Sequence, residues 1–454
     1  MTAALPAAGT RPAVYPAPGP VDPGGGGRGR PGRVLNSPTA LRALLAGLVL
    51  LSLAWGAFGG WVADQHSSAA DAVGTTDQRL SLEARQMYSS LADADATITA
   101  ALLASRQPPL GQLQRYENDL ATATTELPRL QAAPGNQATS AALARVNAGL
   151  SGYTGYVAAA QSEYAMGYSL TGGSFLQVAS EEAHLVLLPS ANTVFTQENA
   201  ALSAASAQAS GLPTVIAALV LAVLTAVAFY RAQRWLARRT NRVLSPGLVL
   251  ASLLLAISVI WVFVAFLTAR SDLDGGIANG SGPAQNLALA DIGVQRIRGD
   301  AVLNVISRSG TASFQDDFLA TSRKVGPGNG SLLSDAAAAQ QGGGPGTALV
   351  ATAERDATSW YAANNQVYQL GIAADYAAER NLVVGTSAGS SAASYTALDG
   401  HLTQAIGADQ AVFESAATNG ANALDPLEGV VIASSVLMAI GCGWAVSRRL
   451  AEYR

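Results

Sequence analysis

The chain has 454 residues, 49% of them hydrophobic, and its mean hydropathy of +0.24 is high for a soluble protein. The formal net charge of -4 gives no case for binding nucleic acid. The single cysteine, Cys442, excludes a disulfide within this sequence. Long apolar stretches account for the hydropathy and predict a membrane protein.

The first 40 residues are rich in Pro, Gly and Ala and show no apolar periodicity. Such a segment buries too little surface to offset its ordering entropy, so we predict a disordered cytoplasmic tail. The apolar stretch that follows, 41–63, is an alternative candidate for a cleaved signal peptide. A span is the better interpretation, because the tail is long and Trp61 stands where cleavage needs a small residue.

Four apolar stretches are long enough, at about 1.5 Å per helical residue, to cross a hydrocarbon core roughly 30 Å thick. These predicted spans are residues 41–63, 212–230, 247–269 and 429–446. They divide the remainder into two large outer segments, 64–211 and 270–428, a short hairpin, 231–246, and a tail, 447–454.

The sign of the charges predicts the orientation independently of hydropathy. The hairpin holds five arginines and no acid, and both tails are net basic. Residues 64–211 hold thirteen acidic against six basic residues, and residues 270–426 hold fifteen against eight. The positive-inside rule therefore predicts a multi-pass plasma membrane protein with both ends in the cytoplasm and both large segments outside.

The first outer segment shows helical spacing. A heptad seam with steps of three and four is formed by Leu80, Ala84, Met87, Leu91, Ala94 and Ile98. Three further helices are expected near 110–127, 143–164 and 175–209, with Pro189 as a kink or break in the last. Of the tyrosines here, Tyr153 and Tyr164 fall on such a seam and are expected in the core, whereas Tyr156 and Tyr168 do not fall on it.

The second outer segment repeats this plan more loosely, with helices expected at 286–307, 313–325, 348–382 and 392–417. The sequence GLVL at 47–50 recurs at 247–250, and Asp95-Ala96 matches Asp300-Ala301, with offsets of about 200 residues. We therefore predict an all-α membrane protein with four transmembrane helices and two extracytoplasmic up-and-down bundles, formed by internal duplication.

Small residues spaced by four predict close helix packing inside the membrane. They are Ser52, Gly56 and Gly60 in the first span, Ala218, Ala222 and Ala226 in the second, and Ser435, Ala439 and Gly443 in the fourth. The alternative is that Gly and Ala are simply common in this sequence. Contacts within one chain and contacts across a homodimer both fit the spacing.

Nothing in the sequence indicates an enzyme or a bound cofactor. The three histidines are scattered, and no zinc-protease motif, phosphate-binding loop or nucleophile elbow is present. Glu181, Glu182 and His184 are close enough in sequence to contact a metal, but a solvated acidic helix face explains them better. Apart from Arg42 at the start of the first, the four spans hold no acidic, basic or histidine residue, which argues against transport.

A ligand site is a weaker hypothesis. Arg296 and Arg298 offer a carboxylate the bidentate fork that an amino-acid ligand would need, next to Asp300. Trp360 and Tyr361 are candidates for the wall of such a pocket. Ordinary surface charges and core aromatics are the alternative.

The cytoplasmic pieces are too short to hold a kinase or cyclase, so any signal has to pass to a separate protein. The basic hairpin is the candidate contact, through Arg231, Arg234, Arg238, Arg239 and Arg242. At the level of architecture, residues 41–446 resemble the GlnX-type family of actinobacterial four-span membrane proteins, and the outer segments resemble the four-helix sensor bundles of chemoreceptors. That resemblance rests on the four spans, the GLVL repeat, the RVL repeat at 33–35 and 242–244, and the arginine hairpin.

The resemblance implies that the outer segments dock a solute-binding lipoprotein and that the chain relays an amino-acid signal to a cytoplasmic Ser/Thr kinase. It carries no catalytic or ligand residue to this sequence. The leading hypothesis is thus a non-enzymatic signal relay, with membrane lipid, an extracytoplasmic solute-binding protein and a cytoplasmic signalling protein as partners. The alternative is a structural or assembly factor of the cell envelope that acts as a docking scaffold.

Overall fold

The computed structural model describes residues 37–105, 107–133, 135–209, 211, 213–240, 246–307, 312–326, 328, 330–340, 346–385 and 387–451. Over these ranges the regular elements are α-helices, with three single π-helical turns, and no strand occurs. The first half holds α1 (Ser37–Ala72), η1 (Val73–Asp77), α2 (Gln78–Ala104), α3 (Leu110–Ala132), α4 (Gln137–Met166), α5 (Ser169–Glu182), η2 (Ala183–Leu187), α6 (Leu188–Ala209) and α7 (Pro213–Thr240). The second half holds α8 (Pro246–Gly276), η3 (Ile277–Ser281), α9 (Gly282–Ser307), α10 (Ala312–Val325), α11 (Leu332–Ala339), α12 (Thr347–Ile372), α13 (Tyr376–Val384) and α14 (Ser391–Ala451).

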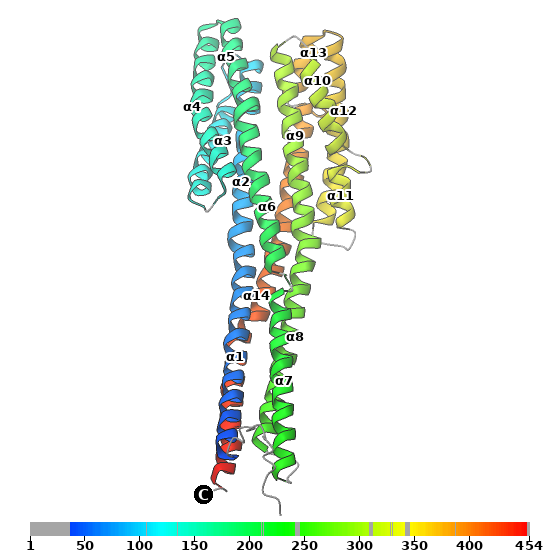
Figure 1. Ribbon diagram of the computed structural model, residues 1–454. Helices are drawn as coiled ribbons and strands as arrows, with labels where there is room; N and C mark the ends of the chain where they lie inside the picture. Colours follow the sequence, from blue (N-terminus) through cyan, green and yellow to red (C-terminus); the bar gives the residue numbers. More distant parts are fainter. Residues whose placement is uncertain are drawn as a thin grey trace, which may run out of the picture.

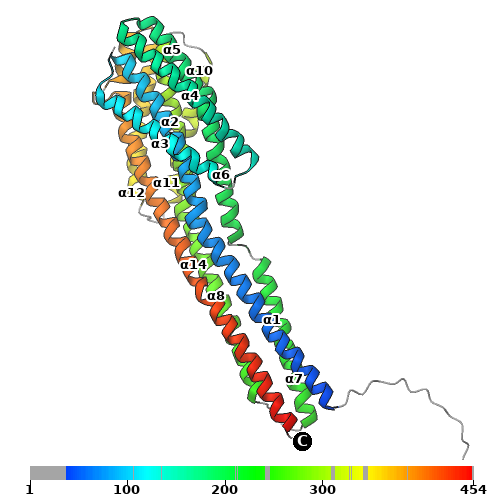
Figure 2. The same cartoon turned by 90° about the vertical axis from the view of Figure 1, so that its left-hand side faces the viewer.

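Long helical runs organise the molecule (Figure 1). Each π-helical turn joins two α-helices without a break, so α1 continues into α2, α5 into α6 and α8 into α9. The 61-residue helix α14 forms a comparable long run by itself, as a single element. The start of α1, the gap between α7 and α8, and the end of α14 all lie at one end of the rod, here named the hairpin end (Figure 2).

Four helical runs are long and apolar enough to cross a membrane, with mean hydropathy between 1.7 and 2.8 in their most apolar windows. They are Arg42–Ala104, Ser169–Trp235, Pro246–Val302 and Ser391–Ala445. The prediction of an all-helical chain is confirmed over the described residues, and the four runs fit the prediction of a multi-pass membrane protein, whose orientation stays a prediction. The helices extend beyond the apolar stretches predicted from hydropathy, because a helix can continue into polar sequence.

In the apolar half of the rod, α14 packs against both α1 and α8. A Cβ atom added at Gly56 would lie 2.5 Å from Ser435 Cβ, so glycine is what allows α1 and α14 to approach there. Gly247 of α8 approaches Gly441 of α14 in the same way, a contact that the predicted ladders did not include. At Gly443, by contrast, an added Cβ would meet no atom within 4 Å.

The other ladder residues vary in their surroundings. Ser52, Ala218 and Ala222 are buried, whereas Ala226 is exposed and Ala439 is partly buried. A Cβ atom added at Gly60 would stand 3.5 Å from Ile432, an ordinary contact distance.

At the other end of the rod, the two outer segments lie side by side and share one hydrophobic core. All six residues of the heptad seam in α2 are buried in it, as are Tyr153 and Tyr164. The same core contains Ile297 of α9 and Trp360 of α12, so the two segments pack as one body.

Two local expectations need correction. The helix does not stop at Pro189, because the π-helical turn η2 immediately before it absorbs the irregularity and α6 continues. The helix expected at 348–382 is interrupted between α12 and α13, where Ala374 has a φ of 57° that a helix cannot contain.

The small-residue contact at Gly56 generates a test. Gly56→Ala should destabilise the membrane part by about 1–3 kcal/mol, because the new methyl group overlaps Ser435. Gly443→Ala is the matched control and should be neutral or stabilising by up to about 1 kcal/mol, since alanine favours a helix where space is open. Thermal unfolding of the full chain in detergent measures both. Equal effects of the two substitutions would contradict close packing at Gly56.

Candidate functional site

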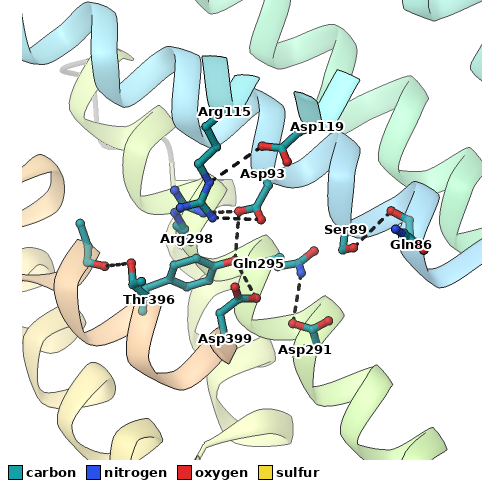
Figure 3. A network of polar contacts seen from close by, with 12 residues as sticks. Gln86, Ser89, Asp93, Arg115, Asp119, Asp291, Gln295, Arg298, Thr396 and Asp399 are labelled. Atoms are coloured by element: carbon teal, nitrogen blue, oxygen red, sulfur yellow. Dashed lines mark hydrogen bonds and ion pairs between the residues drawn. The ribbon is translucent and has the colours of Figure 1, made fainter. Parts of the chain in front are cut away.

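Charged side chains from four helices, α2, α3, α9 and α14, meet where the two outer segments join (Figure 3). Arg298 of α9 donates from Nη1 to Asp93 Oδ1 of α2 over 2.6 Å. Its guanidinium also lies over the ring of Tyr395 in α14, 4.1 Å from the ring centroid. The Tyr395 hydroxyl donates to the same Asp93 oxygen at 3.2 Å. One carboxylate of the first segment thus holds two helices of the second.

The rim of this cluster adds a second arginine. Arg115 of α3 donates from Nη2 to Asp93 Oδ2 at 3.3 Å and lies 4.0 Å from Asp119. Burial and the neighbouring Asp93 carboxylate raise the pKa of Asp119 and Arg115 lowers it, with a net value of about 6. Asp399 of α14 is within 3.4 Å of the Tyr395 hydroxyl, and burial raises its pKa as well.

A second ion pair crosses the same interface closer to the membrane half. Arg85 of α2 donates to Asp291 Oδ2 of α9 over 3.0 Å, and the Gln295 amide donates to the other oxygen at 3.1 Å. Asp291 is buried, and burial raises its pKa to about 7 although Arg85 acts in the opposite direction. Both oxygens therefore have donors, as a buried carboxylate requires.

The third cross-segment contact is a buried histidine between two aspartates. His184, in η2, has Nε2 3.4 Å from Asp95 Oδ2 of α2 and Nδ1 3.6 Å from Asp300 Oδ1 of α9. Ser180 donates to Asp95 over 3.0 Å. A Cβ atom added at Gly299 would lie 2.5 Å from His184 Cε1, so the missing side chain makes room for the ring.

The two carboxylates keep this imidazole charged. Burial alone lowers the pKa of His184, but hydrogen bonding and attraction to Asp300 and Asp95 outweigh it and raise the pKa to about 9. A protonated histidine with an acid on each ring nitrogen is an ionic bridge rather than a proton-transfer group. The cluster as a whole can hold two segments in one register.

The residues proposed for a ligand pocket are only partly brought together. Arg298 and Trp360 both adjoin Tyr395, since the Trp360 and Tyr395 ring centroids are 6.5 Å apart. Tyr361 makes an edge-on contact with Trp360 at 5.2 Å. Arg296 is exposed and points to another face of α9. The Arg298 guanidinium, which the hypothesis assigned to a ligand, is instead paired with Asp93, a carboxylate of the same chain.

The sequence analysis did not single out the pairing of His184 or most of the other site residues, which are Asp93, Tyr395, Asp399, Arg85, Asp291, Arg115 and Asp119. One signal was present, because Asp95 and Asp300 matched each other in the proposed repeat, and these two now contact the same ring. His184 bonds to them rather than joining Glu181 and Glu182 in a metal site. Among the residues that the model covers, no group of three or more His, Cys, Asp or Glu is arranged to hold a metal ion.

Four of the five arginines proposed for the cytoplasmic contact lie on the last turns of α7, at the hairpin end. Arg231, Arg234 and Arg238 are exposed and spaced by three and four, so they share one helix face. The side chain of Arg239 and the whole of Arg242 lie outside the described residues.

One comparison with known proteins bears on this site. Residues 69–207 match the model of a family described as an actinobacterial sensor domain. No curated protein and no solved structure matches the chain. The match ends before α7, so the matched segment supplies Asp93, Asp95 and His184, and the second half supplies Arg298 and Asp300. A sensor domain with four candidate spans fits a membrane sensor or signalling protein.

The charge on His184 predicts a pH dependence. Because its pKa is raised from 6.5 to about 9, its contribution to stability is complete below pH 6.5 and is lost as the pH rises through about 9. At about 1.4 kcal/mol per pKa unit, this contribution is on the order of 3 kcal/mol. His184→Gln should therefore lower the unfolding temperature of the full chain at pH 7, and the difference from wild type should shrink towards pH 10.

His401→Gln is the control, because His401 pairs with Asp356 at 2.6 Å within the second segment and is more exposed. An exposed pair contributes little, so this variant should behave nearly as wild type. A His184→Gln effect that stayed constant from pH 6 to pH 10 would show that His184 does not act through its charge.

Proposed function

We propose that the protein is a non-enzymatic membrane signal relay, which couples an extracytoplasmic amino-acid sensor to a cytoplasmic signalling partner such as a Ser/Thr kinase. The observation that carries the proposal is the continuity of α14. One helix holds Tyr395 in the interface between the outer segments, contacts α1 at Ser435, and ends at the hairpin end. A tilt or shift of its outer part would pass along one continuous helix, in which Pro426 removes a single backbone hydrogen bond between the outer part and the apolar part.

The outer segments would receive the signal by docking a solute-binding lipoprotein. Exposed apolar side chains stand on two turns at the end of the rod opposite the hairpin end (Figure 1). These are Met166, Tyr168 and Leu170 around the turn from α4 to α5, and Ile372 and Tyr376 around the turn from α12 to α13. Exposed apolar and aromatic residues of this kind are typical of protein contacts.

We further infer that the two outer segments are duplicated up-and-down bundles. The π-helical turns η1 and η3 directly follow α1 and α8, which hold the first and third apolar stretches, at the same offset of about 200 residues that separates the sequence repeats. Asp95 and Asp300 occupy matching places on the helices that follow those turns. A duplication explains why both halves turn towards one interface.

The proposal requires the hairpin end to face the cytoplasm. Topology reporters inserted after Ser140, which is exposed on α4, and after the exposed Gly328 should both be active outside the cell, and a fusion after Arg454 should be active inside. The acidic outer segments and the basic hairpin end support this arrangement. An outer segment found in the cytoplasm would remove the basis of the relay.

The relay itself is tested at the hairpin end. Replacing Arg231, Arg234 and Arg238 with glutamine should reduce amino-acid-dependent phosphorylation of the kinase substrate at least tenfold, because these exposed charges would form the contact with the partner. Arg145→Gln, an exposed arginine of the first outer segment, is the control and should leave the response intact. Membrane abundance is measured for each variant. A normal response in the triple variant would exclude the arginines from signalling and favour the envelope scaffold.

A further inference from the structure

A groove between α7 and α8 opens towards the membrane. It has a volume of about 460 Å³, within the range of roughly 300–1,000 Å³ typical of ligand sites. Its walls are apolar over most of their length, with Leu219, Val223 and Ala226 on α7 and Val259 and Ile260 on α8. The packing of these two helices against each other therefore leaves space that an apolar chain can fill.

The groove becomes polar as it approaches the hairpin end. Tyr230, Gln233 and Ser252 line it there, and the Gln233 amide donates to Ser252 Oγ at 2.9 Å. Arg234 donates from Nη1 to the Tyr230 hydroxyl over 3.3 Å, which holds a positive charge beside the mouth. Arg231 shares the exposed face of this turn. The site thus offers an apolar channel that ends in hydrogen-bond donors and positive charge.

The length of the groove along α7 matches the thickness of one leaflet of a bilayer. From Leu219 to Gln233, α7 rises about 20 Å at about 1.5 Å per residue, comparable to half of a hydrocarbon core roughly 30 Å thick plus its interface. The groove therefore extends from near the middle of the bilayer to the headgroup region on the hairpin side.

We propose that this groove binds an anionic phospholipid, with an acyl chain between α7 and α8 and the phosphate beside Arg234 and Arg231. The choice follows from charge complementarity. A zwitterionic lipid satisfies the apolar channel but brings a positive group to the arginines, and a soluble anion satisfies the arginines but leaves the channel unfilled. Basic pockets between transmembrane helices on the cytoplasmic side bind anionic headgroups in this way.

The site goes beyond the proposed relay, because it needs only the membrane insertion of α7 and α8. The orientation proposed above determines which leaflet supplies the lipid, and reporter fusions test that separately. The outcome of a lipid-binding experiment therefore stands apart from the outcome of the phosphorylation assay.

Native mass spectrometry of the full chain, released from detergent, tests the proposal with phosphatidylglycerol and phosphatidylcholine of the same chain length. Wild type should retain phosphatidylglycerol at least tenfold better. Arg231→Gln combined with Arg234→Gln should remove that preference, since each arginine near the surface contributes about 1 kcal/mol. Arg42→Gln, an exposed arginine at the same end of α1, is the charge control and should keep it.

The channel has its own pair of variants. Ala226→Trp should fill the groove and reduce retention of both lipids, whereas Leu224→Trp, at an exposed α7 position outside the groove, should not. Equal retention of the two lipids by wild type would overturn the proposal, and so would unchanged binding in Ala226→Trp. A dimer that is present in wild type and lost in Ala226→Trp would also overturn it, because a second copy would then occupy the groove.

Discussion

The constraint on which the structure depends is that backbone polar groups in hydrocarbon have no water to bond with. Only a helix satisfies them within one segment, so each candidate span is helical throughout its apolar part. Three of the four helices do not end where hydropathy falls. Helices α1 and α8 continue through η1 and η3 into the outer segments and α14 does so without interruption, whereas α7 begins at Pro213. The outer core is therefore built on the same helices as the membrane core, and rearrangement of one has to move the other.

The second determinant is the cost of buried charge at the interface between the outer segments. Removing one partner from a buried pair costs about 3–5 kcal/mol, whereas an intact pair adds little net stability. The three cross-segment contacts, Asp93 with Arg298, Arg85 with Asp291, and His184 between two aspartates, are satisfied together in one register of α2 against α9. We infer that together they favour this one alignment, and that the charged His184 adds stability as well. Hydrophobic contacts in the shared core supply the attraction.

The sequence was informative where the determining pattern is local. The seam from Leu80 to Ile98 predicted burial correctly because neighbours three and four residues away share a helix face. It was uninformative about the interface, because Asp93 and Asp95 look like a solvated acidic face until α9 is placed against them. Arg298 was singled out for the right chemistry, the binding of a carboxylate, but nothing local reveals that the carboxylate comes from 205 residues away in the same chain. Charge pairs between residues far apart in the chain leave no periodic pattern in the sequence from which they could be predicted.

That internal pairing also bears on how a signal would enter. A free amino acid that used Arg298 would have to displace Asp93, which the shared core holds in contact at 2.6 Å. Even a flexibly tethered group competes at an effective concentration on the order of millimolar, and a rigidly placed one competes better. A docked protein avoids this competition, because it can bind exposed turns and shift the helices by differential affinity for two arrangements. The occupied guanidinium is therefore a physical reason to favour indirect sensing through a partner over direct capture of the amino acid.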